Sequence, residues 1–263
     1  MDASVQAGVT RLSLDAPPKT APDSLAVEEP LEIRVRGQSI AVTMRTPGHD
    51  EELAAGFLLT EGILHQRGDI LEIAHCRSDP DAALSGNILN VFLAADVALD
   101  LKRLTRHVFS GSSCGLCGKA SIDSVHQQFS PIEKRLDIPL ALLLELPAKL
   151  RALQATFDST GGLHAAGLFS GDGQIIVARE DIGRHNAVDK VIGHAFLQNS
   201  LPLDHHILFV SGRASFEIMQ KALAARIPIV AAVSAPSSLA VEFARESNQT
   251  LYGFVRAQSA NRY

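Results

Sequence analysis

The chain has 263 residues, of which 46% are hydrophobic and 20% charged, and this balance indicates a globular protein large enough for two domains. Its net charge of −5, without long runs of one sign, argues against a protein whose main task is to neutralise a nucleic-acid backbone. No apolar run reaches the roughly 18 residues that a membrane-spanning helix needs, and the first residues lack a secretory-signal pattern. We therefore expect a cytoplasmic protein with neither nucleic-acid nor membrane partners.

The first part of the chain predicts a tail and then a small α+β domain. Residues 1–28 mix prolines and charges without periodicity, which predicts a disordered tail. Apolar residues then alternate over 33–44 around Arg36-Gly37-Gln38, a pattern typical of a hairpin. The same reasoning gives three further elements: a helix opened by acidic residues at 50–52, and strands at 70–75 and 87–94. Residues 29–105 are therefore interpreted as one small α+β domain.

The second part alternates helices with short apolar strands, a pattern typical of a buried, largely parallel sheet. A helix over 147–158 and a hairpin around Ser170-Gly171-Asp172-Gly173 come first. The other expected elements follow in order: helix 184–198, strand 207–210, helix 215–226, strand 229–233, helix 237–246 and strand 251–255. Residues 106–263 are therefore interpreted as an α/β domain.

Two of the three cysteines form a close pair in a loop rich in glycine and serine. Cys76 lies in an apolar stretch and is interpreted as a buried bystander. Cys114 and Cys117 lie in the segment 110–119, ahead of residues with helical periodicity. If Ser112 or Ser113 caps that helix, its dipole lowers the pKa of a neighbouring thiol and favours the reactive thiolate.

Such a pair has three interpretations. Half of a zinc site is disfavoured, because zinc usually needs four ligands and the sequence offers no second cysteine pair or close histidine pair; we expect no metal. A thioredoxin-type dithiol normally follows the first strand of a compact fold, whereas this pair lies between two domains. The third interpretation is a sulfur carrier, in which one thiolate accepts a sulfane sulfur and passes it on.

A zinc deaminase would need Glu at the position of Ala166, two residues after His164, so we expect no deaminase activity.

Two predicted helices begin directly after strands, at Ser211–Ser215 and Ser234–Ser238. Free backbone N–H groups and the helix dipole favour phosphate at such positions, and Arg213 can add a bidentate contact. The alternative is that both are ordinary capped helices without a ligand. A polar cluster over 180–190 contains Arg184 and His185 and has more polar residues than a solvated helix face needs.

These segments together resemble the FdhD/NarQ family, the formate dehydrogenase accessory sulfurtransferases. The resemblance rests on seven blocks in the family's order, at 45–54, 112–118, 160–166, 180–190, 211–217, 235–240 and 250–256. It implies a homodimeric sulfurtransferase that accepts persulfide sulfur from a cysteine desulfurase. The acceptor it implies is the molybdenum (or tungsten) bis(molybdopterin guanine dinucleotide) cofactor of formate dehydrogenase. It also implies a three-layer, cytidine-deaminase-like core with a mixed, largely parallel sheet behind the small N-terminal domain.

The same resemblance implies the roles of individual residues. Cys114 and Cys117 are expected to be the catalytic thiols. The position of Cys114 at the helix-capping end of the loop, where a lowered pKa is expected, predicts that it is the main persulfide site. The residues expected to bind the cofactor, or GDP as its partial mimic, are Ser211, Gly212, Arg213, Ser237, Ser238, Tyr252, Gly253, Phe254, Val255, Arg256, Ala257, Arg184 and His185. A second class of function stays open, a non-catalytic cofactor chaperone whose thiols only ligate or sense.

The relative position of the thiols and the cofactor site is also open. Cys114 belongs to the loop that joins the two domains, ahead of the sheet. Phosphate sites belong to the carboxyl edge of parallel strands. We therefore expect the two on opposite faces, with the alternative that they meet directly on one face.

Overall fold

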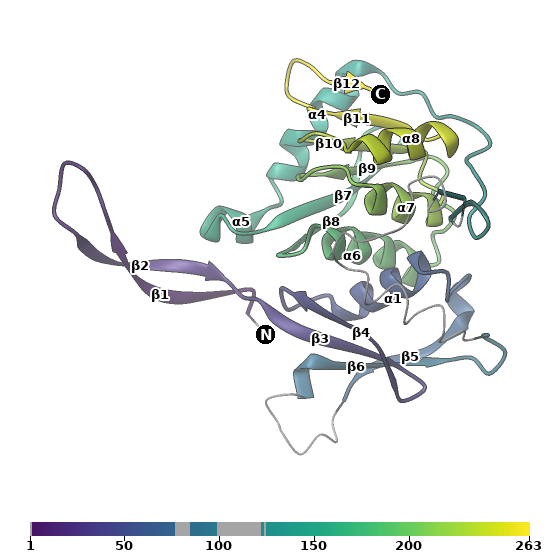
Figure 1. Cartoon of the computed structure of the whole chain (residues 1–263), viewed down its shortest axis with the longest axis horizontal. Coiled ribbons are helices and arrows are strands. Elements are labelled where there is room, and N and C mark those ends of the chain that lie inside the picture. The colour runs from purple at the N-terminus through teal and green to yellow at the C-terminus, as the bar shows by residue number, and fades with distance from the viewer. Residues whose placement is uncertain (1, 77–84, 99–121, 124) are drawn as a thin grey trace.

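The computed structural model describes residues 2–76, 85–98, 122–123 and 125–263. It shows two main sheets whose helices lie against each other, and a separate two-stranded sheet (Figure 1). The smaller sheet has four strands in the order β4-β3-β6-β5. These are β3 (Glu29–Val35), β4 (Gln38–Arg45), β5 (Ile70–His75) and β6 (Ile88–Leu93), with short 3₁₀ turns η1 (Arg67–Asp69) and η2 (Ser85–Asn87). Helix α1 (Asp50–Thr60) shares one apolar core with this sheet through Leu53, Leu58 and Ile33. The predicted hairpin, helix and two later strands of this part are confirmed.

The turn between β3 and β4 explains why the hairpin could be predicted. Arg36 and Gly37 both have positive φ angles, of 51° and 75°. Two consecutive residues in the left-handed region form a turn whose twist matches that of antiparallel strands. Glycine adopts this conformation at little cost, so Gly37 fixes the point at which the alternating apolar pattern reverses.

The larger sheet has six strands in the order β12-β11-β10-β9-β7-β8. They are β7 (His164–Ser170), β8 (Ile175–Asp181), β9 (His206–Val210), β10 (Ile229–Ala232), β11 (Thr250–Gly253) and β12 (Asn261–Arg262). Strands β9, β10 and β11 are parallel, whereas β7 is antiparallel to both neighbours and β12 is antiparallel to β11. The sheet is therefore mixed as expected, but parallel pairing is confined to these three adjacent strands.

Helices cover both faces of the larger sheet and make three layers (Figure 1). On β9, Leu208 and Val210 belong to the apolar cluster shared with the helices of one face, whereas Ile207 and Phe209 belong to the cluster on the other. The first face carries α6 (Arg184–Leu197), α7 (Phe216–Ala224) and α8 (Ser238–Glu246), and the second carries α4 (Leu140–Arg151). The narrower likeness to a cytidine deaminase stays a prediction. Among the described residues, no helix combines the length and apolar character needed to span a membrane.

Residues 4–26 differ from the disordered tail that was expected over residues 1–28. Strands β1 (Ser4–Arg11) and β2 (Lys19–Ala26) pair antiparallel along their whole length and extend away from the body of the molecule (Figure 1). The base of this hairpin reaches the larger domain, where Gly162 lies beside the Ala26 side chain. Val5, Ala7 and Val9 alternate with polar residues here, a short pattern that the surrounding prolines and charges obscured.

Two other local expectations also need correction. The helix expected over 147–158 instead begins at Leu140 and ends at Arg151, and a short helix, α5 (Ala155–Thr160), follows it. Pro147 lies inside α4, because burial of Leu143, Leu146 and Leu150 on one stripe offsets the backbone hydrogen bond that proline removes. Cys76, expected to be buried, is half-buried just after β5.

Helices α1 and α6 join the part of the chain around the four-stranded sheet to the part around the six-stranded sheet through an unusually close crossing; these parts are called the smaller and the larger domain. A Cβ atom added at Gly193 would lie 1.8 Å from the backbone oxygen of Glu52, and one added at Gly56 would lie 1.9 Å from that of Asp189. The two backbones therefore touch at this point, and only glycine leaves room on either side. The interface between the domains is built around this contact.

We expect Gly193→Ala to lower the free energy of unfolding by about 1–3 kcal/mol or more, because the added methyl group forces α1 and α6 apart. Urea unfolding followed by circular dichroism measures the change. Gly68→Ala is the matched control, since a Cβ atom added there would meet nothing within 4 Å and the φ of Gly68 is not positive. Equal unfolding midpoints for the two variants would contradict the close crossing.

Candidate functional site

Three loops meet at one edge of the six-stranded sheet, because the carboxyl ends of parallel strands lie at the same edge. After β9 and β10, Ala214 forms a parallel bridge with Pro236, and the N–H of Ser237 donates to the Ala214 oxygen at 3.0 Å. After β11, the N–H of Phe254 donates to the Ser234 oxygen at 3.2 Å. The two predicted helix starts and the terminal strand, far apart in sequence, are therefore neighbours. We call this region the sheet edge.

Several of the serines at the sheet edge already have structural partners. The Ser237 hydroxyl caps α8 by accepting a hydrogen bond from the N–H of Ala240 at 3.2 Å. The Ser211 hydroxyl accepts from the N–H of Ala165 at 2.9 Å and holds the start of β7. Ser238 is the first residue of α8 and is exposed. The structural roles of the Ser237 and Ser211 hydroxyls thus agree in part with the interpretation of these segments as ordinary capped helices without a ligand.

The start of α6 brings Arg184 and His185 to the same edge. A Cβ atom added at Gly212 would lie 3.4 Å from His164 Nδ1 and 3.8 Å from Arg184 Cδ, so these three residues are in close contact. His185 Nε2 lies 3.2 Å from the Ser215 hydroxyl at the start of α7. The sheet edge therefore unites Arg184, His185 and Gly212, as predicted from separate segments. It also includes His164, which was not among the expected binding residues.

Arg184 has hydrogen-bonding capacity that the described part of the chain does not use. Its Nε atom is buried and has no hydrogen-bond partner among the described residues. A buried donor without a partner costs about 1–3 kcal/mol. The guanidinium group is therefore suited to an acceptor that comes from outside the chain, such as a phosphate oxygen.

Burial and positive neighbours keep both histidines of the sheet edge neutral. Burial lowers the pKa of His164, and the positive charges of Arg184 and Arg213 lower it further. The pKa of His185 is lowered to about 4, first by burial and then by Lys221 and Arg184. At neutral pH the positive charge of this region therefore resides on its arginines. Positive charge is what the binding of a phosphate group requires.

The terminal segment Tyr252–Ala257 is held tightly against the neighbouring loops. A Cβ atom at Gly253 would lie 2.9 Å from Pro236 Cδ, so the backbone of this segment approaches the loop after β10 closely. Phe254 has a φ of 52°, a left-handed conformation unusual for a residue other than glycine. The exposed Arg256 donates from Nη1 to the Val233 oxygen, while Val255 is buried. The sequence predicted the location of this segment but not its strained backbone.

A cavity of about 730 Å³ lies next to the sheet edge, between α4, α5 and the ends of β9 and β10. This volume is within the range of about 300–1,000 Å³ found for small-molecule sites. Ser211, His164 and Ala257 belong to both the sheet edge and the cavity wall. The rest of the wall is mainly apolar and includes Leu144, Pro147, Leu150, Phe157, Phe209 and Val233.

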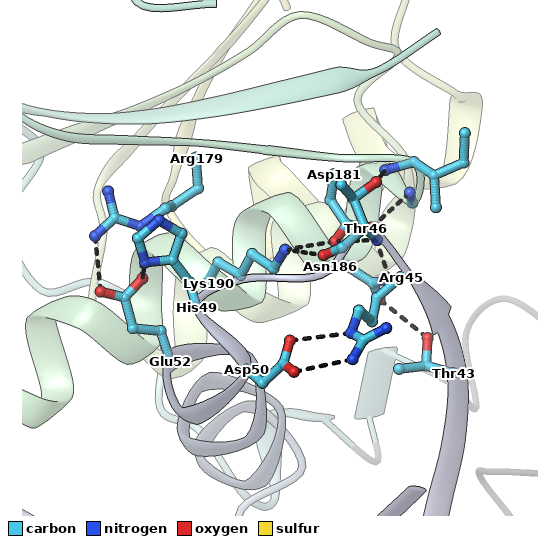
Figure 2. A network of polar contacts seen from close by, with 12 residues as sticks. Thr43, Arg45, Thr46, His49, Asp50, Glu52, Arg179, Asp181, Asn186 and Lys190 are labelled. Carbon is cyan, nitrogen blue, oxygen red and sulfur yellow. Dashed lines mark hydrogen bonds and ion pairs between the residues drawn. The ribbon is translucent and has the colours of Figure 1, made fainter. Parts of the chain in front are cut away.

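The polar cluster over 180–190 divides into a buried part and an accessible part. Figure 2 shows the contacts of the buried part. Asp181 is buried and accepts hydrogen bonds from Lys190 Nζ at 2.7 Å, Asn186 Nδ2 at 2.9 Å and the N–H of Gly183 at 2.8 Å. It also accepts from the N–H of Thr46 at 3.2 Å, and Lys190 donates to the Thr46 oxygen at 2.9 Å. These residues, interpreted from sequence as one polar cluster, connect the two domains and leave only part of the cluster for a ligand.

Two arginine–carboxylate pairs lie beside these contacts (Figure 2), and the second of them crosses between the domains. Arg45 donates to both oxygens of Asp50 at 3.0 Å, and Arg179 donates to both oxygens of Glu52 at 2.6 and 2.7 Å. Burial acts to raise the pKa of Glu52, but its hydrogen bonds with Arg179 and His194 outweigh burial and lower it. The acidic residues predicted to favour the start of α1 thus also bind partners elsewhere in the fold.

The two cysteines that were expected to be catalytic lie outside the described residues. Cys114 and Cys117 belong to the segment 99–121, so their roles and their position relative to the sheet edge stay predictions. Among the described residues, no group of three or more His, Cys, Asp and Glu side chains is arranged to hold a metal ion. The expectation of no bound zinc likewise stays a prediction, because it concerns the cysteines.

Comparisons with known proteins agree on one family. The sequence model of the FdhD/NarQ family matches residues 26–263. A protein from Mycolicibacterium paratuberculosis named sulfur carrier protein FdhD is 55% identical over 245 residues, which cover 92% of this chain and 90% of that protein. A protein of the same name from Streptomyces coelicolor is 51% identical over 253 residues, 95% of this chain and 90% of its own.

A solved structure shares the fold. The crystal structure of a protein described as a formate dehydrogenase accessory protein, from Desulfotalea psychrophila, matches with a TM-score of 0.77. The match covers 99% of this chain and 96% of that chain at 23% sequence identity. At this level of identity the comparison shows that the two chains have the same fold.

The lowered pKa of His185 predicts a pH dependence of stability. Between its ordinary value of 6.5 and about 4, the unfolded state binds a proton that the folded state does not. Stability is therefore highest above pH 6.5 and falls as the pH decreases through this window. His185→Gln should reduce the loss of stability between pH 7.5 and pH 5, as measured by urea unfolding. His205→Gln, at an exposed histidine, is the control; an unchanged pH dependence in His185→Gln would contradict the assignment.

Proposed function

The chain belongs to the FdhD/NarQ family, and we propose that it is a sulfur carrier protein that acts in the maturation of formate dehydrogenase. The observation that carries the proposal is the 55% identity, over nine-tenths of its length, to a relative named sulfur carrier protein FdhD. The Cys114–Cys117 pair in its glycine- and serine-rich loop supplies the chemistry that such a role needs. The protein would work as a homodimer in the cytoplasm.

In the loading step, the Cys114 thiolate attacks the outer sulfur of a persulfide on a cysteine desulfurase. The sulfur–sulfur bond of the donor breaks, the donor cysteine leaves as a thiolate, and Cys114 carries the persulfide. Delivery as sulfide needs two electrons, because sulfane sulfur has to be reduced. The Cys117 thiol supplies them together with Cys114 when the two form a disulfide. This assigns Cys117 the role of the resolving thiol.

The proposed acceptor is the molybdenum bis(molybdopterin guanine dinucleotide) cofactor, held as cargo at the sheet edge. Arg184, Arg213 and Arg256 provide positive charge there, and α7 and α8 begin beside them. The buried Nε of Arg184, which lacks a partner among the described residues, supports an anionic ligand. The cavity beside the edge adds room for a ring system. These features fit the phosphates and the heterocycles of a dinucleotide.

We expect Cys114 to gain the mass of one sulfur atom when the protein is incubated with a cysteine desulfurase and free cysteine. Cys114→Ser should abolish the adduct, and Cys117→Ser should retain it while delivery fails, because no resolving thiol remains. Peptide mass spectrometry without reductant measures both, with Cys76→Ser as the control. An adduct found solely on Cys117 would reverse the assignment. Adducts on neither residue would favour a cofactor chaperone that does not carry sulfur.

Arg213→Ala should weaken GDP binding by about 1.5–3 kcal/mol, because a charge-assisted hydrogen bond to phosphate is lost. Isothermal titration calorimetry measures the affinity, and circular dichroism verifies the fold. Arg245→Ala on α8 removes the same charge from an exposed position and serves as the matched control. If Arg213→Ala binds GDP as tightly as the control, Arg213 is not part of the site.

A further inference from the structure

The cavity beside the sheet edge contains a buried polar side chain whose hydrogen-bonding capacity is unused. Gln154 lies between α4 and α5, is only 5% exposed and lines the cavity. Its backbone forms hydrogen bonds with Arg151 and Asp158, but its side-chain amide has no partner among the described residues. The two amide atoms are not among the fully buried polar atoms that lack a partner, so they are reachable from the cavity. A ligand in the cavity can therefore form hydrogen bonds with them.

The surroundings of Gln154 restrict what that ligand can be. Leu150, Phe157 and Phe209 give the cavity apolar walls, and the two phenyl rings can pack against an aromatic ring. His164 and Ser211 connect the cavity to the sheet edge, where Arg184 offers a donor to an anion. The complementary molecule therefore combines a planar ring with polar atoms on its rim and a negatively charged group attached to it.

We propose that this cavity binds a heterocycle with an amide-type edge, in which a ring carbonyl stands beside a ring N–H, and that Gln154 recognises this edge. The Gln154 Nε2 group donates to the ring carbonyl, and its Oε1 accepts from the ring N–H. Guanine and the pterin ring share this edge, so the chemistry fits either ring system of the proposed cargo. The inference rests on the proposed function for the identity of the cargo, and it adds a specificity-determining residue outside the sheet edge.

Recognition of the ring can be measured separately from recognition of phosphate. Gln154→Leu has nearly the same shape but cannot form hydrogen bonds. It should weaken binding of GDP and guanosine by about 10- to 100-fold, as expected for two lost hydrogen bonds. Binding of pyrophosphate should not change, because the arginines of the sheet edge are intact. Isothermal titration calorimetry with each probe measures the difference, and Gln198→Leu, at an exposed glutamine, is the matched control.

A second measurement distinguishes ligand recognition from a structural role. Without ligand, Gln154→Leu should have an unfolding midpoint close to that of the wild type, because the substitution removes no side-chain hydrogen bond among the described residues. A clearly lower midpoint would show that Gln154 stabilises the fold, and would overturn the proposal. A normal midpoint together with unchanged affinity for every ring-containing probe would overturn it as well.

The choice of probe identifies the ring. Selective loss of GDP and guanosine binding in Gln154→Leu assigns the cavity to guanine, whereas selective loss of binding of free pterin, detected by its fluorescence, assigns it to the pterin. Persulfide loading of Cys114 by a desulfurase should be normal in this variant, because the loading step uses the thiol and the donor persulfide and does not require a bound ring. Failure of loading in the wild type would therefore count against the sulfur-carrier function alone, and the ring-binding assays would still decide the role of Gln154.

Discussion

The buried carboxylate of Asp181 holds the two domains in their relative arrangement. It accepts hydrogen bonds from Lys190, Asn186 and the backbone of Gly183 in the larger domain, and from the backbone of Thr46 in the smaller one. Lys190 is 1% exposed, so its ammonium group has no access to water and is neutralised by this carboxylate. Removing one member of such a buried pair leaves an uncompensated charge, which typically costs about 3–5 kcal/mol. The two domains are therefore fixed relative to each other by electrostatics as well as by the close glycine crossing of α1 and α6.

This connection also fixes the site. Asp181 ends β8, and α6 begins three residues later, so the contacts that hold Asp181 and Asn186 also orient the first turn of α6. Arg184 and His185 project from that turn toward Gly212 and Ser215. A single run of polar residues thus performs two tasks: its buried members build the domain interface, and its accessible members face the sheet edge. The many polar residues over 180–190 suggested a site in the sequence. About half of them are there because they build the domain interface.

The sheet edge and the cavity next to it differ in their chemistry. Charge is concentrated at the edge, where Arg184 and Arg213 lie near two histidines that are neutral at physiological pH. Apolar surface is concentrated in the cavity, whose wall includes the amide-bearing side chain of Gln154. A ligand with phosphates and heterocycles can therefore be held without burying an unpaired charge, which would be costly in the apolar part of the site.

Local patterns in the sequence were enough to locate many of the strands. The break at Arg36-Gly37 located the first hairpin, and the apolar runs at 207–210, 229–233 and 251–255 located three strands whose carboxyl ends had to share an edge. The sequence did not show which polar residues are buried. Burial depends on distant contacts, such as the hydrogen bond from Thr46 to Asp181, which are 135 positions apart in sequence. The continuation of α4 through Pro147 and the position of Gln154 beside a cavity likewise depend on packing against distant strands. Periodicity depends on neighbours a few residues away, whereas burial and pairing depend on contacts that form only when the whole chain has folded.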